Sequence, residues 1–123
     1  MIVRSLVSVV DDDESIRESL PDLLREFGFA ARVFSSAEEF LESNVLGQTR
    51  CLILDVAMPG TSGPDLQLEL RRRESRIPII FITAHRDETF RSHVLEDGAV
   101  DCLLKPFTDM ALLDALHSAM ETS

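Results

Sequence analysis

Several aspartates stand directly after apolar runs that are typical of buried strands. Asp11 and Asp12 follow the run that ends at residue 10, and Asp55 follows the run that ends at residue 54. If these runs are neighbouring parallel strands, their carboxyl ends lie together at the sheet edge where folds of this kind bind ligands. Converging carboxylates repel one another unless a proton or a cation joins them. Because Mg²⁺ prefers oxygen ligands and keeps several waters, we expect Asp11, Asp12 and Asp55 to bind Mg²⁺ or Mn²⁺.

A hydroxyl and an ammonium group are expected at the same edge. Thr83 closes the apolar run Ile-Ile-Phe-Ile-Thr, and Lys105 closes the run Cys-Leu-Leu-Lys. A threonine at a strand end is usually structural and a lone lysine is usually solvated, but Lys105 stands between apolar residues where the acids gather. An ammonium group there offsets the acidic charge and can hold a phosphoryl oxygen. A cis peptide before Pro106, a form that about 5% of such bonds adopt, would aim Lys105 inward.

Together these residue types match the needs of phosphoryl transfer. A carboxylate nucleophile, a bridging metal, a hydroxyl donor and a cation serve a reaction that depends mostly on positioning and charge neutralisation. No arrangement of His, Cys or Ser suggests another nucleophile, since His85, His93 and His117 are scattered along the chain. His85 is expected in a surface loop. Asp13 is expected near the start of the first helix, as its cap.

The elements that must position these residues alternate between short apolar runs and longer amphipathic stretches. We predict strands at 6–10, 30–34, 51–54, 78–82 and 102–104, and helices at 14–27, 37–44, 64–74, 88–96 and 110–120. The first, third and fourth runs are almost continuously apolar, as expected for strands covered by helices on both faces. Five strand–helix repeats predict an α/β fold with a doubly wound, five-stranded parallel sheet of the flavodoxin type and strand order 2-1-3-4-5. We expect a single domain over residues 1–123.

Local signals support several boundaries. Ser36 and Glu39 form a capping box ahead of the second helix, and Gly28 stands where the first helix should end. Pro21 lies inside the first predicted helix, where a proline removes a backbone hydrogen bond. Because the apolar face of this helix continues on both sides of Pro21, we predict a kinked helix rather than a break.

Charge and composition narrow the classes of partner. The chain has 22 acidic and 12 basic side chains, a formal net charge of −10. Such a surface repels nucleic-acid phosphates and anionic lipids, so we expect no direct binding to nucleic acid or membrane. No signal peptide or membrane span is evident. Cys51 and Cys102 lie in apolar runs on strands separated by another strand, so we expect a cytoplasmic protein with two buried thiols and no disulfide.

Four motifs, in order along the chain, resemble those of bacterial response-regulator receiver domains. They are Val-Val-Asp-Asp-Asp at 9–13, Leu-Asp-Val-Ala-Met-Pro-Gly-Thr-Ser-Gly at 54–63, Ile-Thr-Ala at 82–84 and Lys-Pro-Phe at 105–107. Each motif alone is weak, but the four together are highly specific, and the similarity extends over essentially the whole chain. The stretches Thr-Ala-His and Gly-Ala-Val-Asp are most similar to receivers of the FixJ-like, nitrogen-fixation group.

The resemblance implies roles for the acidic residues. Asp55 matches the phosphoacceptor, and Asp12 matches the direct metal ligand. Asp11 matches the carboxylate that holds a metal-bound water and helps to place Asp12. Ala57, two residues after Asp55, would offer its backbone carbonyl to the metal.

The resemblance also implies a signalling switch rather than a conventional enzyme. Thr83 matches the switch hydroxyl and Lys105 the phosphate-binding lysine. The family takes its phosphoryl group from a sensor histidine kinase, catalyses only its own phosphorylation and dephosphorylation, and often forms homodimers when phosphorylated. The chain departs from the family at Cys102, where Tyr or Phe is usual, and at Pro21. We therefore expect activation to act through Thr83 and residues 84–87, with Cys102 as a passive packed position.

Two alternatives come from other functional classes. A phosphohydrolase of the haloacid-dehalogenase type also combines a strand-end Asp, Mg²⁺, a hydroxyl and a Lys, but it needs a second Asp where this chain has Ala57. A receiver that acts only as an interaction module, and is never phosphorylated, usually lacks one of the acids or the lysine that are present here. A dinucleotide-binding domain is excluded because no Gly-x-Gly-x-x-Gly follows the first strand.

Overall fold

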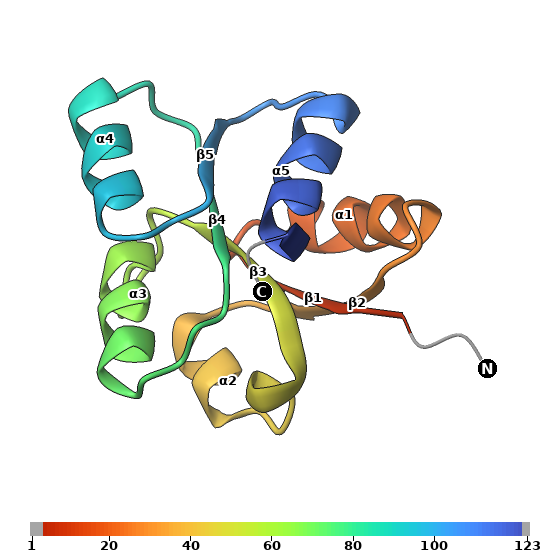
Figure 1. Cartoon of the computed structure of the whole chain (residues 1–123), viewed down its shortest axis with the longest axis horizontal. Coiled ribbons are helices and arrows are strands. Elements are labelled where there is room, and N and C mark those ends of the chain that lie inside the picture. Colours follow the sequence, from red (N-terminus) through yellow and green to blue (C-terminus); the bar gives the residue numbers. More distant parts are fainter. Residues whose placement is uncertain (1–3, 122–123) are drawn as a thin grey trace.

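A parallel five-stranded sheet forms the centre of the molecule, with helices on both of its faces (Figure 1). The computed structural model describes residues 4–121. The strands, in spatial order β2-β1-β3-β4-β5, are β1 (Leu6–Val10), β2 (Ala30–Phe34), β3 (Thr49–Asp55), β4 (Ile79–Thr83) and β5 (Asp101–Leu104). The helices are α1 (Glu14–Glu26), α2 (Ala37–Glu42), the short 3-10 helix η1 (Leu46–Gln48), α3 (Gly63–Arg72), α4 (Glu88–Glu96) and α5 (Asp109–Glu121). The predicted doubly wound fold of the flavodoxin type, with this strand order, is thus confirmed.

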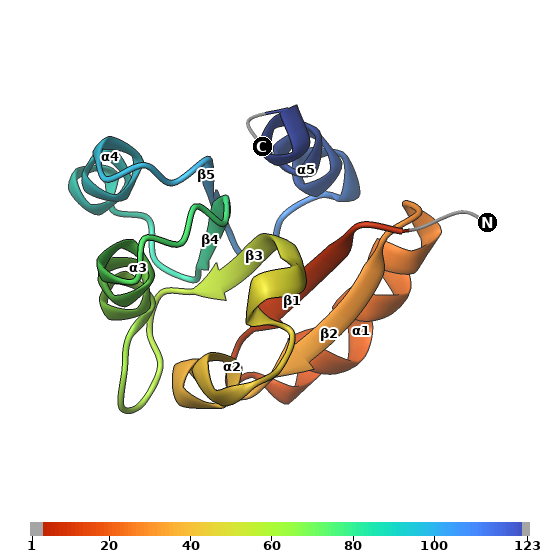
Figure 2. The ribbon, with the colours of Figure 1, turned by 60° about the horizontal axis from the view of Figure 1, so that its bottom comes forward.

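The α-helices divide between the two faces of the sheet, as the turned view shows (Figure 2). On one face, Leu24 of α1 and Leu116 of α5 pack in one core cluster. On the other face, Phe40 of α2, Leu66 of α3 and Val94 of α4 pack in a second cluster. The central strands β3 and β4 are almost wholly buried between these layers, which is why their sequences are nearly continuously apolar. Across residues 4–121, no helix combines the length and apolar character needed to cross a bilayer.

The second helix begins as predicted and ends early. The Ser36 side chain accepts the backbone N–H of Glu39 at 3.1 Å, so the cap is confirmed. The Glu39 carboxylate accepts from the Ser35 hydroxyl at 2.9 Å instead of closing the capping box. α2 ends before the predicted residue 44 because Ser43 is extended and its hydroxyl donates to the Phe40 carbonyl at 2.7 Å. The chain then forms η1, which the sequence pattern did not predict.

The first helix continues through its proline. α1 is uninterrupted, and Pro21 is buried on the side of the helix that faces the core. Asp13 is the N-cap, since its carboxylate accepts the backbone N–H of Ser15 at 2.9 Å, as predicted. Gly28 follows the helix with a φ of +94°, a left-handed conformation that favours glycine and ends the helix there.

The two cysteines lie on opposite faces of the sheet. Cys51 on β3 belongs to the core under α1 and α5, whereas Cys102 on β5 belongs to the core under α2, α3 and α4. Both are buried and free, which agrees with the predicted absence of a disulfide. Burial raises the pKa of the Cys51 thiol to about 12, so it stays protonated at neutral pH.

Candidate functional site

The carboxyl ends of neighbouring strands bring the predicted side chains to one edge of the sheet. β1 and β3 pair directly, so that Asp11 and Asp55 lie side by side where these strands end. β4 pairs with β5, and the backbone N–H of Lys105 donates to the carbonyl of Thr83 at 2.7 Å. The parallel order of the sheet therefore gathers residues that are far apart in the sequence.

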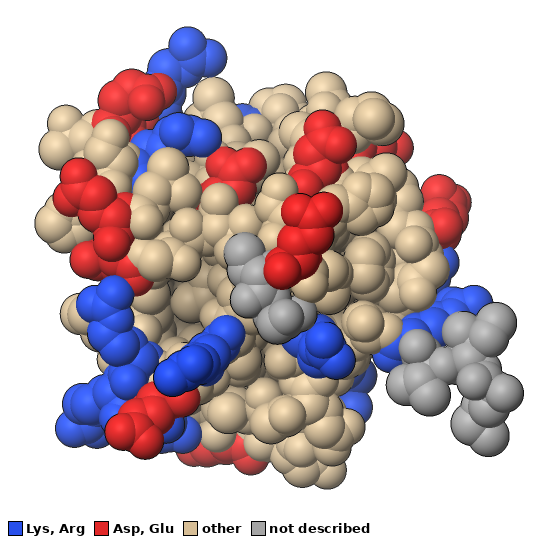
Figure 3. Space-filling view, in the orientation of Figure 1, with Lys and Arg blue, Asp and Glu red and all other residues tan. Residues whose placement is uncertain are grey.

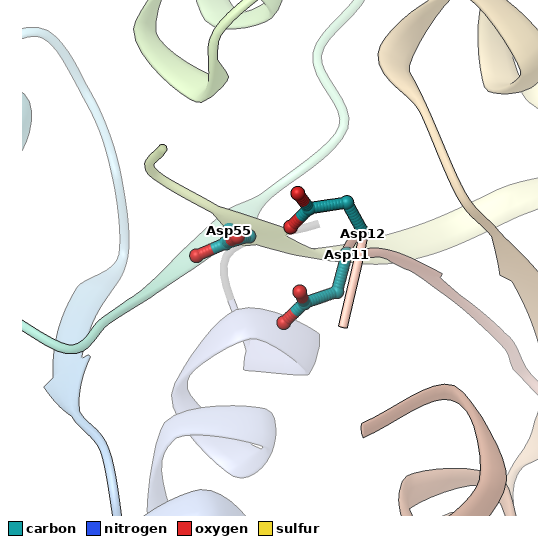
Figure 4. A group of neighbouring side chains, drawn as sticks. All are labelled: Asp11, Asp12 and Asp55. Atoms are coloured by element: carbon teal, nitrogen blue, oxygen red, sulfur yellow. The ribbon is translucent and has the colours of Figure 1, made fainter. Parts of the chain in front are cut away.

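The side chains of Asp11, Asp12 and Asp55, which the sequence predicts to lie together, point into the same space (Figure 4). One carboxylate oxygen from each of Asp11, Asp12 and Asp55 lies within 4.8 Å of those of the other two. Asp11 is fully buried and Asp55 is 6% exposed, whereas Asp12 is exposed. Asp11 is also fixed in place, because its Oδ1 accepts the backbone N–H of Asp13 at 2.9 Å.

Lys105 reaches into this acidic cluster from the end of β5. Its Nζ lies 2.9 Å from Asp11 Oδ2 and 3.5 Å from Asp55 Oδ1. The peptide bond between Lys105 and Pro106 is cis, the less frequent form that the sequence left open. Lys105 thus contacts two of the three acids, and the contact with Asp11 is the shorter.

Burial and crowding change the ionisation of the site. Burial raises the pKa of Asp55 to about 7, and the negative charge of Asp11 adds to this effect, while Lys105 opposes it. Burial lowers the pKa of Lys105, but its hydrogen bond and attraction to Asp11 outweigh burial, so the pKa of Lys105 is raised overall. Three carboxylates thus face one ammonium group. Oxygen donors with excess negative charge suit Mg²⁺ or Mn²⁺, so the residues at this edge fit a divalent cation.

Thr83 lies at the same edge, but its hydroxyl faces the following loop. Its Oγ1 accepts the backbone N–H of His85 at 3.1 Å and donates to the His85 carbonyl at 3.4 Å. Thr83 is 8% exposed, while His85 is exposed in the loop, as predicted. The Thr83 hydroxyl is therefore tied to the backbone of His85 in the loop that follows β4.

Glu38, which the sequence analysis missed, holds the loop that follows Asp55. This residue, in the first turn of α2, accepts the backbone N–H of Thr61 through Oε2 at 3.3 Å. Gly60 has a φ of +77°, and a Cβ there would lie 2.9 Å from the same carboxylate oxygen. Hydrogen bonds from its own backbone and from Thr61 lower the pKa of Glu38. No local pattern marks this contact, because the two residues stand 23 positions apart.

A backbone hydrogen bond also joins the two ends of the loop at residues 56–62. The backbone N–H of Gly63 donates to the carbonyl of Val56 at 3.0 Å. A Cβ at Gly63 would overlap the backbone carbonyl oxygen of Asp55, so α3 can begin close to the candidate phosphoacceptor only with glycine there. Ala57, whose carbonyl the resemblance assigns to the metal, is exposed in this loop. The loop is thus fixed by Gly63 on one side and by Glu38 on the other.

Cys102 occupies the position where an aromatic ring was expected from the resemblance. It is 6% exposed, and burial raises the pKa of its thiol. It borders a hollow of about 190 Å³ that Thr83, Arg91 and Leu104 also line. Arg91 of α4 also forms an ion pair with Asp101 of β5 at 3.1 Å. A small side chain and an adjacent space thus replace the bulk of a ring.

Comparisons with known proteins identify the family. A family model described as the response regulator receiver domain matches residues 7–117. Nodulation protein W of Bradyrhizobium diazoefficiens is 48% identical over 118 residues, which cover 96% of this chain and 52% of that protein. The transcriptional regulatory protein FixJ of Azorhizobium caulinodans is 38% identical over 95% of this chain and 56% of that protein. The chain thus spans about half the length of these curated relatives.

Solved structures agree with these matches. The crystal structure of FixJ-N superposes with a TM-score of 0.86 at 35% identity, over 99% of this chain and 98% of that chain. A low-resolution structure of the response regulator StyR gives a TM-score of 0.89 at 44% identity, over 98% of this chain and 61% of that chain. The family match, these relatives and the acidic strand ends show that the chain belongs to the response-regulator receiver domains of two-component signalling.

Proposed function

We propose that this chain is a phosphoaccepting switch in which Asp55 receives a phosphoryl group from the phosphohistidine of a sensor kinase. The observation that carries the proposal is the placement of Asp55, which is buried within 4.8 Å of two other carboxylates and 3.5 Å from the Lys105 ammonium group. A buried carboxylate flanked by a cation and by metal ligands is suited to nucleophilic attack on phosphorus. The chain belongs to the response regulator receiver domains, which supports a sensor kinase as the donor.

The proposed transfer exchanges one bond to phosphorus for another. An Asp55 oxygen forms a bond to phosphorus while the phosphorus–nitrogen bond of the kinase histidine breaks. The electron pair of that bond stays on the imidazole nitrogen, which accepts a proton. Lys105, placed between Asp11 and Asp55, would contact a phosphoryl oxygen. Attack by water later restores the carboxylate and releases inorganic phosphate.

Asp12 and Asp55 would hold Mg²⁺ or Mn²⁺ directly, Asp11 through a water, and Ala57 through its backbone carbonyl. Burial raises the pKa of Asp55, and the neighbouring carboxylates of Asp11 and Asp12 add to this effect; a group of three close carboxylates supports this assignment. When bound, the cation supplies positive charge that keeps Asp55 ionised and offsets the charge of the phosphoryl oxygens.

Thr83 is the proposed switch hydroxyl. To donate to an aspartyl phosphate, its Oγ1 must give up its present donation to the His85 carbonyl. Residues 84–87, which lead to the Asp87 cap of α4, would then shift. Cys102 would stay in place, because its short side chain has no ring to move between buried and exposed positions.

Further proposals concern organisation and partners. Residues 1–123 would form one receiver domain, and phosphorylated copies would pair as homodimers through the face of α4, β5 and α5. The net charge of −10 opposes direct binding to nucleic acid or to anionic membrane. A cytoplasmic location is in keeping with two buried free cysteines.

The proposal is tested by incubating the protein with acetyl phosphate and Mg²⁺ and then reducing the acyl phosphate with borohydride, which marks the modified aspartate. Peptide mass spectrometry should find one marked residue, Asp55. Folded protein that binds Mg²⁺ but carries no mark would instead support an interaction module that is never phosphorylated.

A further inference from the structure

Three adjoining hollows run along the amino-terminal ends of the strands, at the opposite edge of the sheet from Asp55. Their volumes are about 500, 270 and 440 Å³. The first two share Arg76 in their lining, and the second and third share Arg50. We call this surface the amino-edge trough; its lining includes Arg4, Arg50, Arg71, Arg76, Ile77 and Pro78.

The amino-edge trough is basic although the chain is acidic. Four of the 12 basic side chains line it, while Asp97 is the one carboxylate among the described residues that do so. In the space-filling view, Lys and Arg atoms gather in the lower part of this face, around the C-terminal end of α3, with some Asp and Glu atoms among them (Figure 3). Because the whole chain carries a net charge of −10, this local excess of positive charge distinguishes the trough from the rest of the surface.

Part of this positive charge is available to a ligand. Arg4 and Arg76 form no hydrogen bond or ion pair with other residues between 4 and 121. Arg71 is held against the end of α4, because its Nη2 donates to the carbonyl of Asp97, yet no carboxylate neutralises it within the same range. Guanidinium groups of this kind bind carboxylates through paired hydrogen bonds.

We propose that the amino-edge trough binds an extended acidic peptide segment of a partner protein. Arg4, Arg71 and Arg76 would pair with the carboxylates of the segment. Its half-buried apolar side chains, Ile77, Pro78 and Val100, would contact the apolar side chains between them. A single-stranded nucleic acid fits less well, because none of the lining residues is aromatic and bases would have no ring on which to stack.

This binding site is separate from the phosphoacceptor site, so the two proposals can fail independently. The test is titration of ¹⁵N-labelled protein with the synthetic peptide acetyl-Glu-Glu-Leu-Glu-Glu-Leu-Glu-Glu-amide. We expect amide shifts at residues 71–77 and 97–100, with none around Asp11. Asp55→Asn should bind the peptide as the unchanged protein does.

Variants of single arginines test whether the trough itself is the site. Arg76→Gln leaves the contact between Arg71 and α4 intact and should weaken binding roughly tenfold. Arg32→Gln is the matched control, since Arg32 is exposed on β2, outside the trough, and its loss changes the charge equally. Arg32→Gln should leave affinity unchanged.

Three results would overturn the proposal. The first is an absence of shifts in the trough at millimolar peptide. The second is equal weakening by Arg76→Gln and Arg32→Gln, which would show general attraction to positive charge. The third is tighter binding of a single-stranded oligonucleotide with the same charge as the peptide.

Discussion

The ammonium group of Lys105 lies closer to Asp11 than to the proposed phosphoacceptor, with Nζ 2.9 Å from Asp11 Oδ2 and 3.5 Å from Asp55 Oδ1. Asp11 has no exposed surface, so Lys105 balances a carboxylate that solvent cannot reach. Its second contact is with Asp55. We infer that Lys105 has two separable roles, one in stability and one in phosphoryl transfer.

Lys105→Ala should therefore change both properties. Loss of the ammonium group leaves Asp11 buried without its cation, which should lower the free energy of unfolding by about 1–3 kcal/mol without unfolding the domain. The rate of phosphorylation by acetyl phosphate should also fall. Arg25→Ala, which removes an exposed ion pair with Asp22, is the control and should change stability by less than about 1 kcal/mol. Urea denaturation and intact mass measure the two effects, and an unchanged phosphorylation rate in Lys105→Ala would contradict the assigned role.

The raised pKa of Asp55 predicts how stability depends on pH without divalent cations. A carboxyl group whose pKa is higher in the folded state favours folding while it is protonated, and this contribution is lost as the pH rises from about 3.8 to about 7. Asp55→Asn lacks the ionisable group. It should therefore match the unchanged protein near pH 4 and be more stable by about 1–3 kcal/mol at pH 8. Mg²⁺ should reduce the difference at pH 8, and a stability difference that is the same at both pH values would contradict the prediction.

Much of this site could be predicted from the sequence because its residues stand at the ends of apolar runs. Once the strand order is known, the runs before Asp11 and Asp55 must lie side by side, and the two carboxylates that end them must then lie close together. The caps at Asp13 and Ser36 were equally local, since each partner lies within three residues.

Contacts that depend on the path of a loop could not be predicted in this way. The contact between Glu38 and Thr61 joins α2 to a loop 23 residues away, and no periodic pattern marks it. The preference of Lys105 for Asp11 over Asp55 depends on distances that differ by less than an ångström. The early end of α2 depends on one hydroxyl, that of Ser43, whose hydrogen bond competes with the helix.

Glu38→Gln tests whether the hydrogen bond between Glu38 and Thr61, which holds the loop at residues 56–62, supports the site. Weakening of the contact with Thr61 should increase hydrogen exchange at the Thr61 amide and lower Mg²⁺ affinity by about twofold, with little change in melting temperature. Glu42→Gln is the matched control, because it removes the same charge from the same helix without touching the loop. Amide NMR titration with Mg²⁺ measures the effect, since the chain has no Trp or Tyr to report it by fluorescence. Equal affinities of the two variants would exclude this role for Glu38.

Thr83 and Cys102 are expected to respond differently to activation. With beryllofluoride as a phosphoryl mimic, the Thr83 hydroxyl should leave His85, and the amides of residues 84–87 should shift. Cys102 should keep its rotamer, and Cys102→Ala should leave activation-dependent association intact. A loop that stays in place while Cys102 changes rotamer would show that the account of the switch is wrong.

The central claim, that Asp55 is the phosphoacceptor, is tested most directly by intact-mass analysis after incubation with acetyl phosphate and Mg²⁺. The unchanged protein should gain one phosphoryl group, and Asp55→Asn should gain none, because an amide is a poor nucleophile. Asp13→Asn removes a nearby carboxylate that serves as a helix cap and should still be phosphorylated. Persistence of the same modification in folded Asp55→Asn protein would contradict the account.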